Sequence, residues 1–144
     1  MAEILLIEDN PGDIMLTKEA FKECSHSHNI TAFKDGIEAL KYLRKEEIYN
    51  NAGVPDLILL DLNLPRKDGR ELLAEIKADS TLKTIPVIVL STSKNEKDIL
   101  TSYELKANCY ICKPVELENF INIILEIERF WLNTVRLPDY RKFI

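Results

Sequence analysis

Leu57-Ile-Leu-Leu-Asp-Leu-Asn-Leu-Pro-Arg-Lys-Asp-Gly69 is the stretch of sequence that decides the fold. Its first four residues are all apolar, which predicts a strand buried on both faces, as in a parallel sheet. This run ends at Asp61, and a proline and a glycine then predict a loop before helical spacing resumes at Leu72. Open α/β sheets bind their ligands at the carboxyl ends of such strands. Because one Asp after one strand is more often a simple turn residue, the hypothesis of a site depends on what the other strands carry.

The same alternation of apolar runs and helical spacing extends over the rest of the chain. Asn10 followed by Pro11 predicts the start of a first helix, with Asp13 in its first turn, where the helix dipole favours a carboxylate. The order of elements predicts an α/β fold: a doubly wound, five-stranded parallel sheet of the flavodoxin type, with a helical extension at its carboxyl end. Strands are predicted at residues 3–7, 30–33, 57–60, 87–90 and 108–112, and helices at about 11–24, 37–49, 72–76, 98–105 and 117–131.

The composition is that of one globular domain. Hydrophobic residues make up 46% and charged residues 30% of the 144 residues, a normal balance for a folded protein. The formal net charge of −5, with no basic cluster, argues against a nucleic-acid partner. Residues 1–7 are too short for a signal peptide and lack its positive charge, and no apolar run approaches the roughly 20 residues that cross a bilayer. We therefore expect a cytoplasmic protein with no membrane partner.

Neither the cysteines nor the histidines predict a site. Cys24, Cys109 and Cys112 are an odd count without secretory context, which predicts no disulfide framework. Cys109 and Cys112 have C-x-x-C spacing, but they fall in a predicted strand, where such positions point to opposite faces. No second pair completes a zinc site. His26 and His28 lie in a polar segment between elements, where we expect a solvated connector.

Acidic residues follow two of the predicted strands. Glu8 and Asp9 come after the first strand and Asp61 after the third. The carboxyl ends of parallel strands meet at one edge, so these carboxylates would repel one another unless a cation lies among them. An all-oxygen set with no His or thiolate favours a hard ion such as Mg²⁺. The sequence therefore predicts a divalent metal site at this edge.

Two further strand ends predict phosphoryl chemistry at the same edge. Ser91 follows the fourth strand and supplies a hydroxyl, while Lys113 follows the fifth and supplies an ammonium group. A cation, an ammonium and a hydroxyl are the groups that stabilise the oxygens of a transferring phosphoryl group. A carboxylate such as Asp61 can itself be the nucleophile and form an aspartyl phosphate.

These motifs together resemble the receiver domain of two-component response regulators. The match comprises Glu8-Asp9, Asp61 within Leu-Leu-Asp-Leu-Asn-Leu-Pro-x-x-Asp-Gly, Ser91, and Tyr110-Ile-Cys-Lys113-Pro114, in the receiver order and spacing. The resemblance implies a receiver domain at residues 1–130 and a C-terminal extension at residues 131–144, which we expect to contact a partner or a second copy.

The resemblance also assigns the phosphoacceptor and the metal ligands. By it, Asp61 accepts the phosphoryl group and Asp9 binds Mg²⁺ directly. Glu8, which replaces the more usual Asp, binds the ion directly or through water, and Asn63 contributes its backbone carbonyl. A protein of this kind assists its own phosphorylation and dephosphorylation and is not a turnover enzyme.

The resemblance assigns the switch residues as well. Ser91, followed by Thr92, stands at the position of the switch hydroxyl, and Tyr110 at that of the switch aromatic. Lys113 stands where receivers hold the phosphoryl group. The peptide bond before Pro114 is expected to be cis, an isomer that only proline makes inexpensive.

Three features narrow the resemblance to the small regulators paired with cyanobacterial phytochromes. They are the second helix extended to Tyr49, the loop 50–55, and the ending Phe130-Trp131-Leu132. This resemblance implies a phytochrome-type histidine kinase as the partner, and red/far-red light as the signal that is relayed as a phosphoryl group.

The last predicted helix has more apolar surface than one contact with the sheet requires. Its apolar positions cover an arc of roughly 220°, against the roughly 100° that faces a core. Either residues 133–144 fold back over the second strip, or a symmetric homodimer covers it. We expect the dimer, and its surface would include Ile123, Phe130, Trp131 and Leu132.

Two other functions remain as alternatives to a phosphorylation-driven switch. A receiver-like adaptor would bind partners without phosphorylation, but such adaptors usually lack one of Asp61, Asp9, Ser91 and Lys113. A phosphatase with an Asp nucleophile would need a second Asp two residues further on as its acid and base. That position is Asn63, a poor proton donor.

Overall fold

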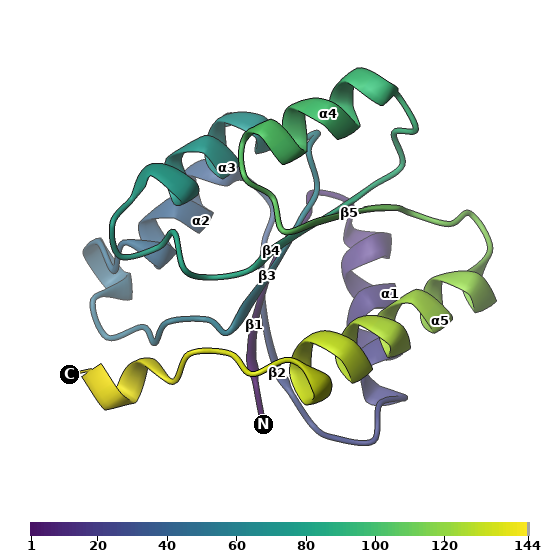
Figure 1. Cartoon of the computed structure of the whole chain (residues 1–144), viewed down its shortest axis with the longest axis horizontal. Helices are drawn as coiled ribbons and strands as arrows, with labels where there is room; N and C mark the ends of the chain where they lie inside the picture. The colour runs from purple at the N-terminus through teal and green to yellow at the C-terminus, as the bar shows by residue number, and fades with distance from the viewer. Residues whose placement is uncertain (144) are drawn as a thin grey trace.

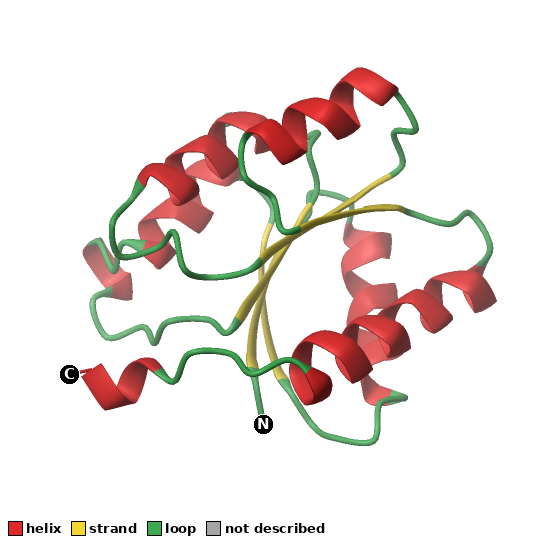
Figure 2. Ribbon diagram, in the orientation of Figure 1, coloured by secondary structure: helices red, strands yellow, loops and turns green. Residues whose placement is uncertain are grey.

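The sheet is parallel, as the sequence predicts. The computed structural model describes residues 1–143. Five strands pair in the order β2-β1-β3-β4-β5 (Figure 2), which places β1 and β3 inside the sheet and β2 and β5 at its edges. The strands are β1 Glu3–Ile7, β2 Asn29–Phe33, β3 Leu57–Leu60, β4 Val87–Ser91 and β5 Cys109–Cys112.

Helices cover both faces of this sheet. Helices α1 and α5 lie on one face, and α2, α3 and α4 lie on the other (Figure 1). None of the helices within residues 1–143 combines the length and hydropathy needed to span a bilayer. The bounds are α1 Pro11–Lys22, α2 Gly36–Leu43, α3 Gly69–Ala78, α4 Glu96–Glu104 and α5 Leu117–Ile127.

The apolar run of β3 is the centre of both cores. All four of its side chains are fully buried, and they alternate between the two faces of the sheet. Leu57 and Leu59 pack on the side of α1 and α5, whereas Ile58 and Leu60 pack on the side of α2 and α3. Strands buried on both faces have continuous apolar runs for this reason.

Side chains that cap the helices fix the loops at the carboxyl edge of the sheet. The Asn10 side chain accepts hydrogen bonds from the backbone of Gly12 and Asp13, which confirms the predicted start of α1. Asp68 caps α3 and Asn95 caps α4 in the same way. Each such cap contributes about 1 kcal/mol. The caps therefore stabilise the turns from which the candidate site residues project.

The second helix is shorter than predicted. It ends at Leu43, and Glu47–Tyr49 form a separate 3₁₀ turn. Lys45 and Glu47 have φ of 56° and 54°, and this left-handed backbone ends the α-helix. The Tyr49 ring packs edge-on against Phe33, 5.5 Å between ring centres. Packing on the end of β2, rather than helical periodicity, explains the apolar character of this segment.

The C-terminal segment also departs from a simple helix. Helix α5 ends at Ile127, and residues Glu128–Thr134 continue it as a π-helix. The chain then passes the N-terminus and reaches the opposite face of the sheet (Figure 1), where the Tyr140 hydroxyl lies 3.1 Å from Thr84 Oγ. The tail therefore does not fold back over α5.

His28 is buried, so the prediction of a solvated connector is wrong for this residue. Its Nδ1 accepts a hydrogen bond from the Ala2 backbone at 3.0 Å, and its Nε2 lies 3.1 Å from Glu128 Oε2. The two side chains are 4% and 5% exposed. His26 remains exposed, 3.5 Å from the same carboxylate. The partner of His28 is 100 positions away in the chain, which local polarity could not reveal.

The cysteines lie as predicted. Cys24, Cys109 and Cys112 are free thiols. Cys109 packs with the core beneath α1 and α5, while Cys112 Sγ lies 3.7 Å from the Ser93 carbonyl at the end of β4. The C-x-x-C pair therefore faces opposite sides of β5.

The buried Glu128 carboxylate predicts a pH-dependent contribution to stability. Burial alone would raise the pKa of Glu128, but hydrogen bonds from His28 and Asn133 outweigh it and hold the pKa below its ordinary value. A pKa that is lower in the folded state stabilises the protein above the unfolded-state pKa, and this contribution is lost as the pH falls through the folded-state value. We expect Glu128→Gln to cost about 1–3 kcal/mol at pH 7 and clearly less at pH 4.

Urea unfolding of both proteins at the two pH values measures this difference. His26→Gln, which changes the exposed neighbour, is the control and should shift stability by less than about 0.5 kcal/mol. A Glu128→Gln deficit of equal size at pH 7 and pH 4 would contradict the assignment.

Candidate metal and phosphoryl site

Three predicted metal ligands come together at the carboxyl edge of the sheet. Because β1 and β3 are neighbours with Ile7 opposite Leu60, the residues that follow them lie side by side. Glu8, Asp9 and Asp61 each offer a carboxylate oxygen, and these oxygens all lie within 4.8 Å of one another. An all-oxygen cluster of this kind fits a hard divalent cation.

Lys113 extends from the end of β5 into this cluster. Its Nζ lies 2.5 Å from Glu8 Oε1, 3.0 Å from Asp13 Oδ2 and 3.7 Å from Asp61 Oδ2. The lysine side chain is only 7% exposed. One ammonium group among four carboxylates, with Asp9 included, leaves the site strongly negative, so it has electrostatic capacity for a divalent ion.

The pKa values of the buried pair reflect this excess of negative charge. Burial raises the pKa of Glu8 to about 7, the hydrogen bond from Lys113 opposes that effect, and the charge of Asp61 adds to it. Burial would lower the pKa of Lys113, but its bonds to Glu8 and Asp13 outweigh burial and raise it. Lys113 therefore stays protonated at neutral pH. A cation bound among the carboxylates would stabilise the ionised form of Glu8.

The loop after β3 holds Asp61 in place. The Asp61 backbone N–H donates to the Ile7 carbonyl at 3.0 Å, and the Asn63 N–H approaches Asp61 Oδ1 at 3.4 Å. The Asp61 side chain is 13% exposed, and Asn63 is exposed. The Gly69 N–H donates to the Leu62 carbonyl at 2.8 Å and closes the loop. Asp61 is thus fixed by backbone contacts yet remains accessible to solvent.

The predicted switch residues meet through a residue that the sequence did not single out. Ser91 is fully buried, and its Oγ accepts a hydrogen bond from the Ser93 N–H at 3.3 Å. The Tyr110 hydroxyl donates to the Ser93 carbonyl at 2.8 Å. Thr92 is exposed, and within residues 1–143 its side chain makes no hydrogen bond. Ser93 therefore links the two, and Thr92 does not.

Sequence reasoning also missed the contact that Asp13 makes. It predicted only a favourable place in the helix dipole, whereas the Asp13 carboxylate is the second partner of Lys113. The sequence did contain a signal for this contact, because Asp13 lies in the first turn of the helix that starts next to Glu8 and Asp9. Only the position of β5 next to β4 brings Lys113 to it.

The expected cis peptide bond before Pro114 is wrong. Every peptide bond within residues 1–143 is trans, Lys113–Pro114 included. Trans is the more stable isomer of this bond by about 0.5–1 kcal/mol, and the Lys-Pro pair permits cis without requiring it.

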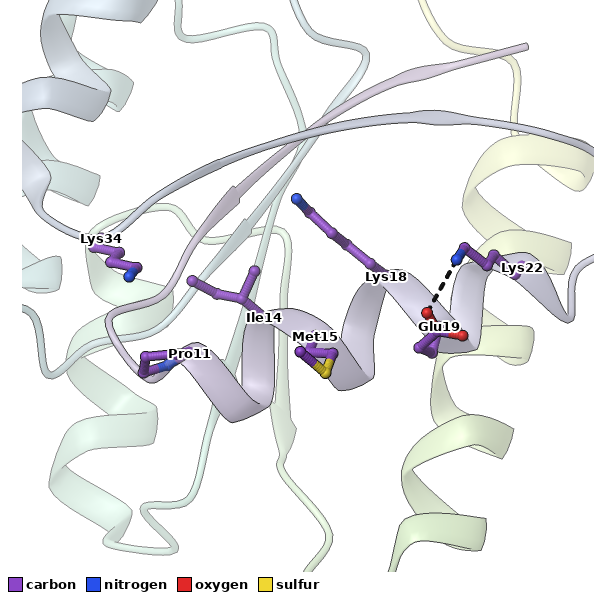
Figure 3. Close-up of a pocket in the computed structure, with 7 residues that line it drawn as sticks. All are labelled: Pro11, Ile14, Met15, Lys18, Glu19, Lys22 and Lys34. Atoms are coloured by element: carbon purple, nitrogen blue, oxygen red, sulfur yellow. Dashed lines mark hydrogen bonds and ion pairs between the residues drawn. The ribbon is translucent and has the colours of Figure 1, made fainter.

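A hollow of about 360 Å³ lies along α1 and is bounded on its other side by Lys34, which follows β2 (Figure 3). It begins at Pro11 and follows the exposed side of the helix past Met15 to Lys22, which is paired with Glu19 at 3.0 Å. None of the clustered carboxylates lines it. The hollow is therefore distinct from the candidate metal site at the strand ends.

Comparisons with known proteins agree with this geometry. The family model described as response regulator receiver domain matches residues 4–125. The chain is 49% identical to response regulator Rcp1 of Synechocystis sp. over 135 residues, covering 94% of this chain and 92% of that protein.

Two solved structures are similar over nearly the whole chain. The phosphorylated cyanobacterial phytochrome response regulator RcpA has a TM-score of 0.93 and 56% identity, over 96% of this chain and 99% of that one. The Mn²⁺-bound form of Rcp1 has a TM-score of 0.92 and 47% identity, over 96% and 100%. The similarity thus extends past α5 into the C-terminal segment.

Gly69 provides a test of the loop that holds Asp61. A Cβ at this position would collide with the Asp61 carbonyl and lie 2.5 Å from Leu62 Cα. We expect Gly69→Ala to lower the free energy of unfolding by about 1–3 kcal/mol, because the backbone must shift. Gly53→Ala is the matched control, since a Cβ there meets nothing within 4 Å. Equal urea midpoints for the two variants would show that the close approach does not constrain the loop.

Metal titration tests the acidic cluster. Mg²⁺ should raise the thermal unfolding midpoint, because an ion that binds only the folded state stabilises it. Asp9→Asn should weaken the apparent affinity about tenfold or more, since it removes a charged ligand. The control is Glu71→Gln, which removes an exposed charge on α3, outside the acidic cluster. Parallel titration curves for Asp9→Asn and the wild type would exclude Asp9 as a ligand.

Proposed function

This chain belongs to the response regulator receiver domain family, and from that premise we propose that Asp61 accepts a phosphoryl group from a histidine kinase. Phosphorylation on Asp is typical of the family. The observation that carries the proposal is the position of the Asp61 carboxylate. It is accessible to solvent, lies among the oxygens of Glu8 and Asp9, and is 3.7 Å from the Lys113 ammonium.

The transfer uses groups from four strand ends. An oxygen of Asp61 attacks the phosphorus atom, a P–O bond forms, and the P–N bond to the donor imidazole breaks. Lys113 holds one phosphoryl oxygen, and the Ser91 hydroxyl donates to another. Glu8, Asp9, Asp61 and the Asn63 carbonyl would hold Mg²⁺, which when bound neutralises charge on the phosphoryl oxygens. The protein accepts one phosphoryl group per cycle and acts as a switch, not as a turnover enzyme.

Phosphorylation then changes the surface beside β5. The new dianion draws the Ser91 hydroxyl away from the Ser93 N–H and toward Asp61, so the loop at Ser93 shifts, and Tyr110 follows because its hydroxyl donates to the Ser93 carbonyl. The outer surface near β4 and β5 thereby adopts one of two states. The output is a protein contact in the cytoplasm, with neither nucleic acid nor membrane as partner. The formal charge of −5 supports this part of the proposal.

The kinase is of the phytochrome type. Support comes from the similarity to RcpA, a cyanobacterial phytochrome response regulator, which covers 96% of this chain and therefore includes the C-terminal segment. Residues 1–130 form the receiver domain and residues 131–144 an extension. On this proposal the signal relayed to Asp61 originates in red or far-red light.

The extension contributes to a homodimer. Phe130 is 53% exposed and stands edge-on to Trp131, with ring centres 5.7 Å apart. Trp131, Leu132 and Ile123 are half-buried against the core beneath α5. Because the tail beyond residue 134 crosses to the other face of the sheet, Phe130 stays uncovered within one chain. A second copy would cover it.

Phosphotransfer distinguishes the switch from a phosphorylation-independent adaptor. Incubation of the protein with acetyl phosphate and Mg²⁺ should add one phosphoryl group by mass spectrometry, because Asp61 is an accessible nucleophile beside a cation site. Asp61→Asn, which preserves shape and removes the nucleophile, should acquire none, and EDTA should abolish the reaction. Equal labelling of both proteins would move the phosphosite elsewhere, and no labelling of the wild type would favour the adaptor.

Sedimentation velocity tests the dimer. At high micromolar concentration we expect a two-chain species, and Phe130→Glu should shift it to monomer because it places a charge in the apolar contact. Ile48→Glu, at an even more exposed apolar position remote from α5, should leave the dimer intact. A wild type that is strictly monomeric at that concentration would overturn the dimer.

A further inference from the structure

We propose that Arg70 is a positioning residue that restrains the β4–α4 loop through Asp98 and Ser93, and so holds the switch residue Ser91 in its unphosphorylated position. The proposal rests on the proposed function, because it concerns how easily Asp61 is phosphorylated. Arg70 touches none of the carboxylates of the acidic cluster; it acts through other residues.

Arg70 joins two helices at the carboxyl edge of the sheet. Its Nη2 donates to Asp98 Oδ1 on α4 at 2.8 Å. Its Nη1 donates to both oxygens of Asp68, the residue that caps α3, at 3.1 and 3.2 Å. Within residues 1–143 this is the ion pair that connects α3 to α4. A planar guanidinium holds two carboxylates in a fixed relation better than an ammonium group does.

The second oxygen of Asp98 extends the connection to the switch loop. Ser93 Oγ donates to Asp98 Oδ2 at 2.7 Å. The Ser93 N–H donates to Ser91 Oγ, and the Ser93 carbonyl accepts from Tyr110. Three polar groups of Ser93 therefore connect Asp98 with both switch residues. We call the chain of contacts Arg70–Asp98–Ser93 the clamp.

The clamp has the features of a specific contact, not of a loose surface ion pair. The side chains of Arg70 and Asp98 are 29% and 26% exposed, so both are largely shielded from solvent. The hydrogen bonds from Ser93 and Arg70 keep the pKa of Asp98 below its ordinary value. The carboxylate thus remains ionised and accepts from both partners at neutral pH.

The geometry predicts that the clamp opposes the conformation adopted on phosphorylation. When phosphorylation draws Ser91 Oγ toward Asp61, the Ser93 N–H loses that acceptor and the loop must shift. Asp98, held by Arg70, keeps the Ser93 hydroxyl on the α4 side and opposes the shift. Removing the clamp therefore lowers the cost of the phosphorylated conformation. A small phosphodonor reacts with the minor, shifted conformation, so its rate rises with the population of that conformation.

The test compares rates of Asp61 phosphorylation by acetyl phosphate. We expect Arg70→Ala and Asp98→Asn each to react about two- to fivefold faster than the wild type, the range for losing one partly exposed ion pair. The double variant should be no faster than the faster single variant, because both changes break one chain of contacts. Arg70→Lys, which retains charge without the planar fork, should lie in between.

Two controls separate the clamp from general loosening and from the metal site. Arg44→Ala breaks an ion pair with Asp79 at 3.7 Å, remote from the switch loop, and should leave the rate unchanged. Mg²⁺ affinity of Arg70→Ala, measured by titration, should equal that of the wild type. If the loss of any surface ion pair accelerated the reaction, Arg44→Ala would react faster too, and damage that reached the metal site would change the Mg²⁺ affinity of Arg70→Ala.

Every other outcome overturns either the proposed function or the clamp. If the wild type takes no phosphoryl group, the proposed function fails and the clamp proposal falls with it. If the wild type is phosphorylated but the Arg70 and Asp98 variants react at the same rate or more slowly, the clamp is overturned and the function stands. Additive effects in the double variant, an equal gain in Arg44→Ala, or a changed Mg²⁺ affinity would also overturn it.

Discussion

Repulsion among carboxylates at one edge of a parallel sheet is the constraint on which the rest of the structure depends. Glu8, Asp9 and Asp61 come within 4.8 Å of one another because β1 and β3 are neighbours and both end there. Lys113 compensates only part of this charge, although it is buried and contacts Glu8 directly. Holding three acids together costs stability unless a cation joins them, and the buried apolar strands supply the rigidity that keeps them in place.

The same edge connects the candidate site to the loop that follows β4. Gly69 packs against the Asp61 carbonyl, and Asp68 next to it both caps α3 and binds Arg70. From there a continuous path of hydrogen bonds runs through α4 to the loop after β4 and to Tyr110. These contacts connect the loop that holds Asp61 to the surface near β5, and a switch of the kind proposed requires that they have a second arrangement.

Much of the fold and of the site could be predicted because the signals are local. The apolar run of β3, the Asn10-Pro11 helix start and the acidic residues after β1 and β3 each depend on a few adjacent residues. What could not be predicted depends on contacts between distant segments. The burial of His28 requires Glu128, 100 positions away, and Asp13 meets Lys113 only after β5 has joined the sheet.

The central claim is that these carboxylates gather one divalent ion beside the residue that is phosphorylated. Anomalous diffraction from crystals soaked in Mn²⁺ tests it most directly, since Mn²⁺ prefers the same oxygen ligands as Mg²⁺. The account predicts one strong peak within bonding distance of oxygens from Asp9 and Asp61, with the Asn63 carbonyl as a further ligand. A peak elsewhere with none at this edge, or an ion that Asp61 does not touch, would contradict it.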